Sequence, residues 1–300
     1  ALFVENFLSN PETILKEDDL IEMAANEYFE TRLIGENSDK WSVVHGPFSN
    51  CNFKKEYSNW TLINHNVNLY DEKLIQIQKD LEFIPAWLFD DAMTTLSNKG
   101  STVGAHIDNY NVFIIQLVGT RKWDLQFKPD HTYRKNIDVK ILENFKEDIS
   151  YTLNPGDLIY IPPHIAHRGT SVTDSLSLSL GFKSIEDKAL VEQFAIELVN
   201  NFNSDDFFKT SFNKAPNDPY LINTDLLQKL KERMLKNITV TDFLEDAILK
   251  FTSATKRPVQ EVDKSFEDFI SIAKDTPLFK DEFVRMSAIK SENSYKVALN

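Results

Sequence analysis

The sequence predicts a mainly β fold, a barrel of the jelly-roll type, followed by a helical region. Short segments with β-type patterns, separated by turn residues, fill residues 87–183, as in barrels and sandwiches. After Lys183 the apolar residues recur at helical spacing instead. Within the β region, His106, Asp108 and His167 are suited to hold one metal ion, and a metal site inside the fold favours a barrel over a sandwich.

The N-terminal third is predicted to alternate between helices and strands. Residues 12–34 form a mostly helical pattern with an apolar stripe that includes Leu20 and Met23. Residues 41–68 alternate apolar and polar side chains, which indicates strands. Residues 71–83 have apolar side chains three and four positions apart and should form a second helix.

The centre of the chain is predicted to be a run of short strands. The alternation at residues 175–180, Ser-Leu-Ser-Leu-Ser-Leu, places all three leucines on one face. Gly156-Asp157 followed by an apolar run and Pro162-Pro163 indicates a turn, a buried strand and a stop. The strands are expected near residues 87–97, 101–107, 111–118, 121–127, 149–153, 157–162 and 175–183.

The part after Lys183 is predicted to be a helical second domain. Its apolar stripes could close its own core or a dimer interface, and the sequence leaves both open. Residues 295–300 look like a strand. Because the chain starts at Ala1 in an apolar stretch, we expect both ends to be cut from a longer protein. The helices are marked by apolar residues at 190, 194, 198 and 202 and are expected again at 225–236, 241–253 and 261–273.

Size and composition allow one large domain and a smaller one, since the chain has 300 residues of which 42% are hydrophobic. The formal net charge is −13. Such a surface disfavours direct nucleic-acid binding and suits a basic protein partner, although simple solubility would also explain it. The single cysteine, Cys51, fits a reducing cytoplasm. No signal peptide or membrane-spanning run is recognised.

His106-Ile107-Asp108 and His167 are the most informative residues. On a strand, positions i and i+2 point to the same face, so His106 and Asp108 can bind one ion. His167 follows the Gly156 to Pro163 segment and would come from a neighbouring strand. Two imidazoles and one carboxylate form the facial triad of non-haem Fe(II) oxygenases, which leaves three metal positions open. A bare His-x-Asp is more often a surface turn, but the flanking strands favour the metal site here.

Arg121 is the second anchor of the predicted site. It begins an alternating strand, so it shares a face with Trp123 and Leu125. A guanidinium on an apolar face needs an anionic partner, and it binds a carboxylate through two charge-assisted hydrogen bonds. We expect that partner to be the distal carboxylate of 2-oxoglutarate. The alternative is a structural ion pair with an acid such as Asp157.

The sequence gives weaker indications that other polar residues bind the co-substrate or the substrate. Asn109 and Gln116 flank the metal strand and could bind co-substrate, as could Tyr110. Asp90 and Asp91 could offer negative charge to a cationic substrate side chain, or could end a strand in solvent. Four further histidines are predicted to be structural, surface or loop residues, namely His45, His65, His131 and His164. No phosphate-binding glycine loop, Cys-x-x-Cys or nucleophile elbow is present.

Several segments resemble the JmjC-type ribosomal oxygenases of bacteria, which are built on the cupin barrel. They are GAHIDNYNVFIIQ at 104–116, GTRKW at 119–123, and PGDLIYIPP at 155–163 with the following His167. WSVVHGPF at 41–48 and IPAWLFDD at 84–91 extend the resemblance. Together they span about the first two thirds of the chain, and the resemblance continues more weakly into the helical part.

The resemblance implies a double-stranded β-helix domain over residues 1–185. A helical dimerisation region at 186–255 and an incomplete winged-helix-like region at 256–300 would follow. It implies His106, Asp108 and His167 as iron ligands, and Arg121 as the residue for the 2-oxoglutarate distal carboxylate. Fe(II), 2-oxoglutarate and O2 would be required, with succinate and CO2 as by-products.

The resemblance also implies a homodimer that hydroxylates a basic ribosomal protein. Its nearest form acts on an arginine of the sixteenth large-subunit protein. Two alternatives remain open at the level of sequence. The same chemistry could act on a histidine of another ribosomal protein, or the chain could be a non-catalytic metal-binding cupin module.

Overall fold

The computed structural model describes residues 1–37, 40–49, 52–69, 72–135, 137, 139–200, 224–238, 241–254, 286–290 and 294–299. The chain divides into two compact units, Ala1–Ser184 and Ile185–Asn300. The further boundary predicted at 255/256 and the helix predicted at 261–273 lie outside the described residues. None of the described helices combines the length and apolar character needed to cross a membrane.

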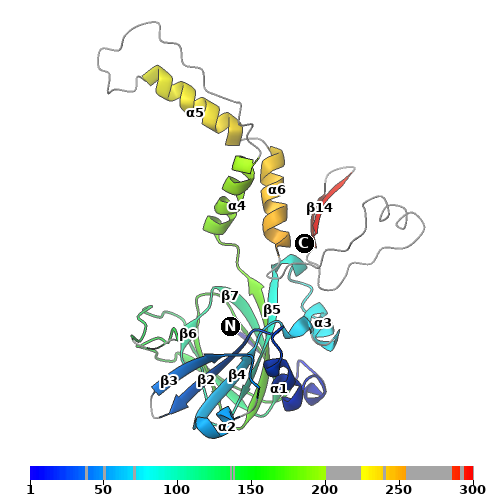
Figure 1. Cartoon of the computed structure of the whole chain (residues 1–300), viewed down its shortest axis with the longest axis vertical. Coiled ribbons are helices and arrows are strands. Elements are labelled where there is room, and N and C mark those ends of the chain that lie inside the picture. Colours follow the sequence, from blue (N-terminus) through cyan, green and yellow to red (C-terminus); the bar gives the residue numbers. More distant parts are fainter. Residues whose placement is uncertain are drawn as a thin grey trace, which may run out of the picture. The chain divides into compact units, whose positions relative to one another are not determined.

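Two antiparallel sheets form the first unit and curve into a barrel (Figure 1). The large sheet has eight strands in the order β1-β10-β7-β12-β5-β4-β2-β3, and the small sheet has four in the order β6-β11-β8-β9. The strands of the large sheet are β1 Leu2–Val4, β2 Thr31–Asn37, β3 Lys40–His45, β4 Asn59–Asn64, β5 Phe89–Ser97, β7 Tyr110–Val118, β10 Leu158–Ile161 and β12 Ser175–Lys183. The small sheet contains β6 His106–Ile107, β8 Arg121–Gln126, β9 Ile149–Leu153 and β11 Ala166–Ser171. This architecture confirms the mainly β barrel predicted from the sequence.

The two faces of the large sheet contribute to different apolar cores, as strand alternation requires. One face packs against the helices α1 (Glu17–Ala25) and α3 (Glu72–Lys79), through residues such as Met23, Leu74 and Leu178. The opposite face, inside the barrel, packs against the small sheet. There Val112 and Ile114 form a cluster with Trp123 and Leu125. The barrel interior therefore lies between the two sheets.

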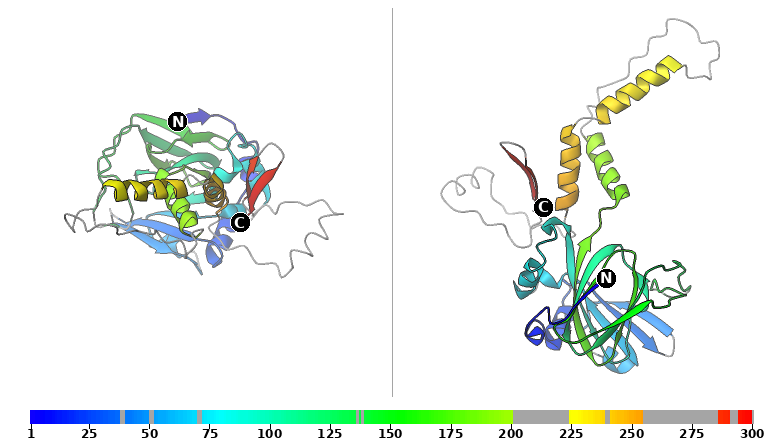
Figure 2. Two further views of the ribbon diagram at one scale, coloured as in Figure 1. Left: turned by 90° about the horizontal axis from the view of Figure 1, so that it is seen from above. Right: turned by 180° about the vertical axis from the view of Figure 1, so that it is seen from behind.

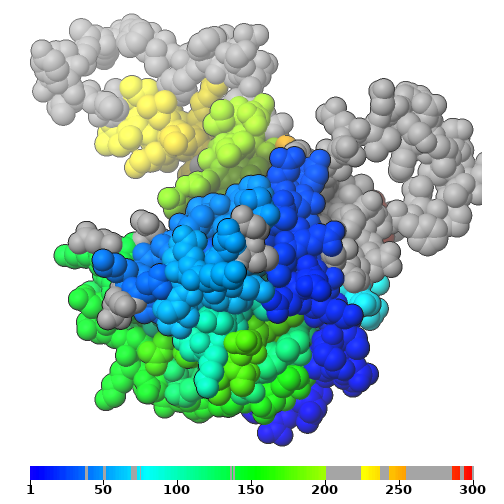
Figure 3. Space-filling view, turned by 60° about the horizontal axis from the view of Figure 1, so that its bottom comes forward, coloured from blue at the N-terminus to red at the C-terminus, as the bar shows by residue number. Residues whose placement is uncertain are grey.

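The N-terminal strand β1 extends the edge of the large sheet. It pairs with β10, with Phe3 opposite Ile159. The view from behind in Figure 2 shows β1 in dark blue along the green strands. In the space-filling view of Figure 3, blue N-terminal residues lie against the green part of the barrel on one face. Residues far apart in the sequence therefore complete one sheet edge.

Short helical segments connect these strands. They are the 3-10 turns Pro11–Thr13, Val67–Leu69 and Ala86–Leu88, and the single helical turn α2 (Phe53–Glu56).

The helical pattern predicted over residues 12–34 is wrong for the last residues of that range. Asn26 at the C-cap of α1 is extended, and Leu33 and Ile34 lie in β2, which pairs with β3 and β4. Pairing on both sides outweighs the local helical pattern.

The second unit contains three described helices and one hairpin. The helices are α4 Asp187–Asn200, α5 Thr224–Ile238 and α6 Thr241–Ser253, and the hairpin strands are β13 Met286–Lys290 and β14 Tyr295–Leu299. Lys250 of α6 pairs with the buried Glu197 of α4 at 2.7 Å, and the Ser287 hydroxyl donates to the Leu249 carbonyl at 3.1 Å. The predicted helices at 225–236 and 241–253 are confirmed. The winged-helix-like arrangement stays a prediction.

Candidate metal centre

The three predicted metal ligands meet at one end of the small sheet. His106 on β6 lies directly opposite His167 on β11 in the antiparallel register. Asp108 follows two residues after His106, and its Oδ2 lies 3.8 Å from His106 Nε2 and 3.5 Å from His167 Nε2. The ligand atoms of all three side chains lie within 4.8 Å of one another. This is the separation expected of groups that bind one ion.

Both imidazoles are oriented by the backbone. His106 Nδ1 lies 3.1 Å from the Gly104 carbonyl oxygen, and His167 Nδ1 lies 3.0 Å from that of Ile165. A carbonyl can only accept, so each Nδ1 carries the proton and each Nε2 presents its lone pair. Such contacts behind the ligands fix ring orientation in metal sites. The two Nε2 atoms are therefore set to bind metal.

His167 is held in the neutral form that a metal needs. Burial lowers its pKa from 6.5 to about 4, and the neighbouring His106 contributes to the lowering. The side chain is almost fully buried, and a charged imidazole is disfavoured in such surroundings. At neutral pH His167 therefore requires no deprotonation before it can act as a ligand.

Two residues with left-handed backbone shape the chain around the ligands. Gly104 has φ +84, and a Cβ there would meet the Ile141 side chain at 2.6 Å, so glycine is required at the entry to β6. His164 also has positive φ, and its N–H donates to the Asp108 carbonyl at 2.9 Å. The sequence predicted His164 only as a loop residue near the site. The structure shows that its backbone supports Asp108.

Arg121 lies on the inner face of β8 and is 1% exposed. Its Nη1 donates to Ser97 Oγ at 3.2 Å and its Nη2 to the Gly169 carbonyl at 3.4 Å. Its Nε has no hydrogen-bond partner. Burial lowers the pKa of Arg121 from its ordinary value to about 10, and the group stays charged at neutral pH. No ion pair to Arg121 occurs among the described residues.

The alternative partner considered for Arg121, Asp157, is engaged elsewhere. Its carboxylate accepts hydrogen bonds from the backbone N–H groups of Asn6 at 3.0 Å and Asn154 at 2.9 Å. Asp157 therefore ties the N-terminal segment to the turn before β10. The buried guanidinium of Arg121 is left with neutral partners, which is a costly arrangement for a charge without an anion.

The side chains between Arg121 and the metal ligands follow from the strand register. Trp123 and Leu125 share the inner face of β8 with Arg121, and Leu125 lies opposite His167 on β11. The Trp123 ring lies 5.3 Å from the Arg121 guanidinium carbon and 5.9 Å from the His167 ring centre. One strand pair therefore carries both the distal ligand and the arginine.

Gln116 and Asn109, the other predicted cofactor-binding residues, differ in their surroundings. The Gln116 amide nitrogen donates to the carbonyls of Val118 at 2.7 Å and Leu176 at 3.3 Å. Its oxygen accepts from the Ser177 hydroxyl at 2.8 Å. These bonds brace an irregularity between β7 and β12 and favour a structural role. Asn109 is exposed between β6 and β7, and its predicted role stays a prediction.

The two acids of the Asp90-Asp91 pair have different partners. Asp91 lies opposite Gly181, in the row of β12 residues that includes Ser179 and Ser177 on the inner face. Its carboxylate lies 3.0 Å from His65 Nδ1. Asp90 is buried, lies at the irregularity where β5 loses its register with β12, and its carboxylate is 3.3 Å from Lys183 Nζ. Asp91 is therefore the acid of the pair that the strand register places on the inner face.

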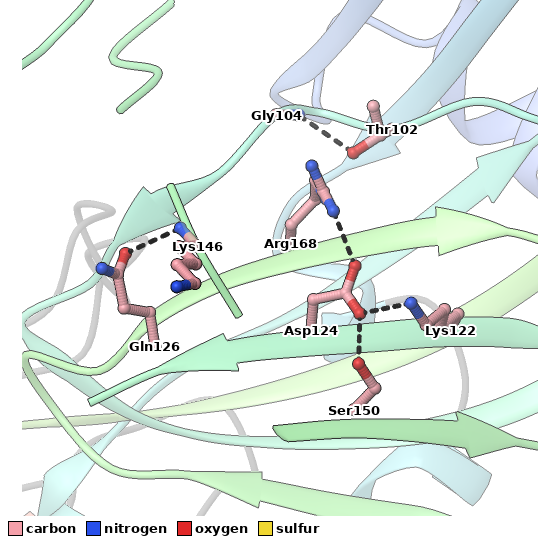
Figure 4. A network of polar contacts seen from close by, with 8 residues as sticks. All are labelled: Thr102, Gly104, Lys122, Asp124, Gln126, Lys146, Ser150 and Arg168. Carbon is pink, nitrogen blue, oxygen red and sulfur yellow. Dashed lines mark hydrogen bonds and ion pairs between the residues drawn. The ribbon is translucent and has the colours of Figure 1, made fainter. Parts of the chain in front are cut away.

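The outer face of the small sheet carries a polar network behind His167. The Asp124 carboxylate, 2% exposed, accepts from Arg168 at 2.9 Å, Lys122 at 2.7 Å and Ser150 at 2.6 Å (Figure 4). Burial alone would raise the pKa of Asp124, but these hydrogen bonds outweigh it, and the pKa is lowered. Arg168 and Ser150 are brought to Lys122 and Asp124 by the pairing of β8 with β11 and β9.

Comparison with known proteins identifies a domain and two curated relatives. Residues 76–190 match the JmjC domain family. The chain is 31% identical over 80% of its length to the ribosomal protein uL16 3-hydroxylase of Escherichia coli. It is 35% identical over 55% of its length to a probable ribosomal oxygenase of Haemophilus influenzae. The chain spans 64% of the first relative and 42% of the second.

Solved structures show the same fold. The E. coli ribosomal oxygenase YcfD in complex with cobalt and 2-oxoglutarate has a TM-score of 0.76 and 22% identity, and the match covers 99% of this chain and 80% of that one. Another crystal structure of YcfD gives a TM-score of 0.77 with the same coverage. The barrel is therefore a JmjC and cupin fold, as the sequence predicted.

Proposed function

From the JmjC domain at residues 76–190, we propose that this chain is an Fe(II)- and 2-oxoglutarate-dependent oxygenase that hydroxylates a ribosomal protein. One observation carries the proposal beyond the domain match. The buried Arg121 guanidinium has no acid partner among the described residues and lies on the same sheet as the three-ligand cluster. A dicarboxylate bound at the metal would supply the missing anion.

The side chains present fit an Fe(II) ion. Two neutral imidazoles and one carboxylate are the donor set of the facial triad, which leaves metal positions for other ligands. His106, Asp108 and His167 would hold the ion, since their ligand atoms lie within 4.8 Å of one another. The carbonyls of Gly104 and Ile165 hold the two rings in the required tautomer.

The side chains also fit 2-oxoglutarate. Arg121 Nε is a buried donor with no partner, so the pocket lacks an acceptor at that atom. A carboxylate would accept from the guanidinium in a charge-assisted pair. The matched YcfD structure contains cobalt and 2-oxoglutarate, which supports the same co-substrate here.

With Fe(II), 2-oxoglutarate and O2 bound, the site would convert a substrate C–H into C–OH while 2-oxoglutarate becomes succinate and CO2. The chain's own residues bind and orient the reactants. Arg121 fixes the end of the co-substrate far from the metal, and the apolar cluster around Ile114 and Leu125 excludes water. In cofactor enzymes the protein usually supplies binding and orientation, and the cofactor supplies the chemistry.

An arginine is the substrate side chain that we favour. The curated relative with 31% identity is named for hydroxylation of uL16. Asp91 places a carboxylate on the inner face of β5, where it would pair with a guanidinium. A neutral histidine would gain less from this charge, so Asp91 favours arginine over the histidine alternative. The non-catalytic cupin module does not explain the unpaired Arg121.

The helical unit would form a homodimer interface. Several apolar side chains on its helices are exposed, including Val191 at 62%, Ile196 at 52% and Val199 at 69%. Exposed apolar side chains gathered on one helix support the proposal of an interaction surface. The net charge of −13 suits a basic ribosomal protein and disfavours direct nucleic-acid binding. We place this activity in the cytoplasm, where ribosomal proteins are made.

The test combines co-substrate turnover with product mapping. The Fe(II)-loaded protein is incubated with 2-oxoglutarate, O2 and purified ribosomal proteins, and succinate and a one-oxygen mass gain are measured. We expect the gain on an arginine of uL16, and its loss in His106→Ala and Asp108→Ala. His131→Asn is the matched control, because His131 is exposed with a left-handed backbone that asparagine tolerates. Full turnover in His106→Ala would refute the metal assignment.

A further inference from the structure

We propose that Gly169 is a positioning residue for Arg121 and thereby sets the affinity for the co-substrate. The inference rests on the proposed function, because it assumes that Arg121 binds 2-oxoglutarate. Gly169 lies on β11 two residues after the ligand His167 and directly opposite Trp123 of β8. Its place on the inner face of the small sheet follows from strand alternation.

The space beside Gly169 is filled by two side chains of β8. A Cβ at this position would lie 2.7 Å from Arg121 Nε and 2.8 Å and 2.9 Å from the Cη2 and Cζ2 atoms of Trp123. All three distances are shorter than real Cβ contacts. Gly169 has no left-handed φ, so its backbone does not call for glycine. The reason for glycine is the close approach of Arg121 and Trp123.

Arg121 has little freedom to move away from an added methyl group. The atom that would be struck is Nε, in the middle of the side chain, whereas Nη1 and Nη2 are held by Ser97 and by the Gly169 carbonyl. The Trp123 ring packs against the guanidinium on another side. A shift of Nε therefore rotates or withdraws the whole guanidinium plane.

The side chains beside Gly169 also contain hydrogen-bond donors that have no acceptor. Arg121 Nε and Trp123 Nε1 are both buried and have no hydrogen-bond partner in the described part of the chain. Few buried donors in proteins lack a hydrogen-bond partner, and a bound ligand is one way to supply the acceptor. Gly169 lies against both side chains, so it keeps them in the positions from which they can meet an acceptor. This second observation links the glycine to ligand binding rather than to packing alone.

The first measurement is the dissociation constant of 2-oxoglutarate from Mn(II)-loaded protein, by calorimetry. We expect Gly169→Ala to raise it at least ten-fold and to leave the Mn(II) dissociation constant within two-fold of the wild-type value. Gly181→Ala is the matched control, because its Cβ would meet only Asp91, at 3.3 Å or more, in a strand without left-handed φ. That variant should bind 2-oxoglutarate like the wild type.

A double-mutant cycle separates positioning from general damage. In an Arg121→Met background there is no guanidinium to displace, so adding Gly169→Ala should weaken 2-oxoglutarate binding less than two-fold further. Additive effects of the two substitutions would overturn the proposal, because Gly169 would then act without Arg121. Unchanged binding in Gly169→Ala alone would overturn it as well.

A second pair of variants covers the case in which Gly169→Ala does not fold. Trp123→Phe removes the ring atoms that the alanine would strike and leaves Arg121 in place. Gly169→Ala combined with Trp123→Phe should then bind 2-oxoglutarate at least ten-fold more weakly than Trp123→Phe alone, and equal binding refutes the proposal. If the wild-type protein itself fails to bind 2-oxoglutarate, the proposed function fails first.

Discussion

Replacing Arg121 with methionine should separate stability from co-substrate binding. In the ligand-free protein the guanidinium is buried with neutral partners only, and burial lowers its pKa from the ordinary arginine value to about 10. Since one pKa unit corresponds to about 1.4 kcal/mol, the charge costs the folded state about 3 kcal/mol relative to the unfolded chain. Because the folded pKa is the lower one, this cost is present at every pH below about 10.

Two hydrogen bonds and the ring contact with Trp123 offset that cost. Together they contribute about 2–4 kcal/mol, and methionine keeps much of the apolar stem. The free energy of unfolding of ligand-free Arg121→Met should therefore lie within about 1 kcal/mol of the wild-type value. Truncation of an ordinary buried side chain of this size costs about 2–5 kcal/mol, so the two outcomes can be distinguished by urea denaturation.

The effect of removing the Arg121 guanidinium should appear when 2-oxoglutarate binds. Removal of one partner from a buried charge pair costs about 2–5 kcal/mol, or roughly 30-fold or more in the dissociation constant. At 2-oxoglutarate one hundred times above the wild-type constant, wild-type Mn(II)-loaded protein gains about 2.7 kcal/mol of stability. A variant that binds one hundred-fold more weakly gains about 0.4 kcal/mol. A destabilised ligand-free variant with a normal 2-oxoglutarate response would refute this reasoning.

Three further predictions concern the substrate, the polar network and the dimer. Asp91→Asn should raise the KM for the ribosomal protein at least ten-fold and leave the KM for 2-oxoglutarate within two-fold of the wild-type value. An unchanged KM for the ribosomal protein would contradict the role of Asp91 in binding the substrate arginine. Asp124→Asn should be less stable than wild type at neutral pH. The folded pKa of Asp124 is lowered, so the difference in the free energy of unfolding between wild type and variant is present above the unfolded pKa of about 3.9. Urea titrations repeated below pH 4 should show this difference becoming smaller. A difference that does not change with pH would contradict the stabilising role of the Asp124 carboxylate. Val199→Asp on α4 should convert the dimer to a monomer in analytical sedimentation. Val172→Asp, at an exposed valine of the first unit, is the control and should stay dimeric. If both variants are dimers, the α4 surface is not the dimer interface.

The sequence was informative where a strand has one apolar face. The strands at 111–118, 121–127 and 175–183 were predicted near their observed bounds because buried aliphatic side chains alternate or cluster there. The ligand spacing in His106-Ile107-Asp108 and the position of Arg121 in an alternating strand then predicted which side chains the barrel would enclose. The structure brings the three ligand side chains together as expected.

The sequence placed His167 on a neighbouring strand but did not give the bounds of that strand, β11, for a physical reason. Its sequence, Ala-His-Arg-Gly-Thr-Ser, contains no aliphatic residue larger than alanine. The inner face of this strand carries His167, Gly169 and Ser171, so it has no apolar stripe. Hydrogen bonds to β6 and β8 impose the extended conformation. Local patterns cannot predict a strand whose residues are determined by neighbours distant in the sequence.

The Asp124–Arg168 pair also bears on how the barrel reaches a single register. These residues lie directly opposite each other across β8 and β11. A slip of one residue would turn Arg121 outward and carry Asp124 into the apolar interior without its partners. Arrangements of this kind would leave a buried carboxylate unpaired and are disfavoured by several kcal/mol. The network behind His167 therefore favours the alignment in which His167 and Arg121 share the inner face of the small sheet, and its loss should give a mixture of folded species.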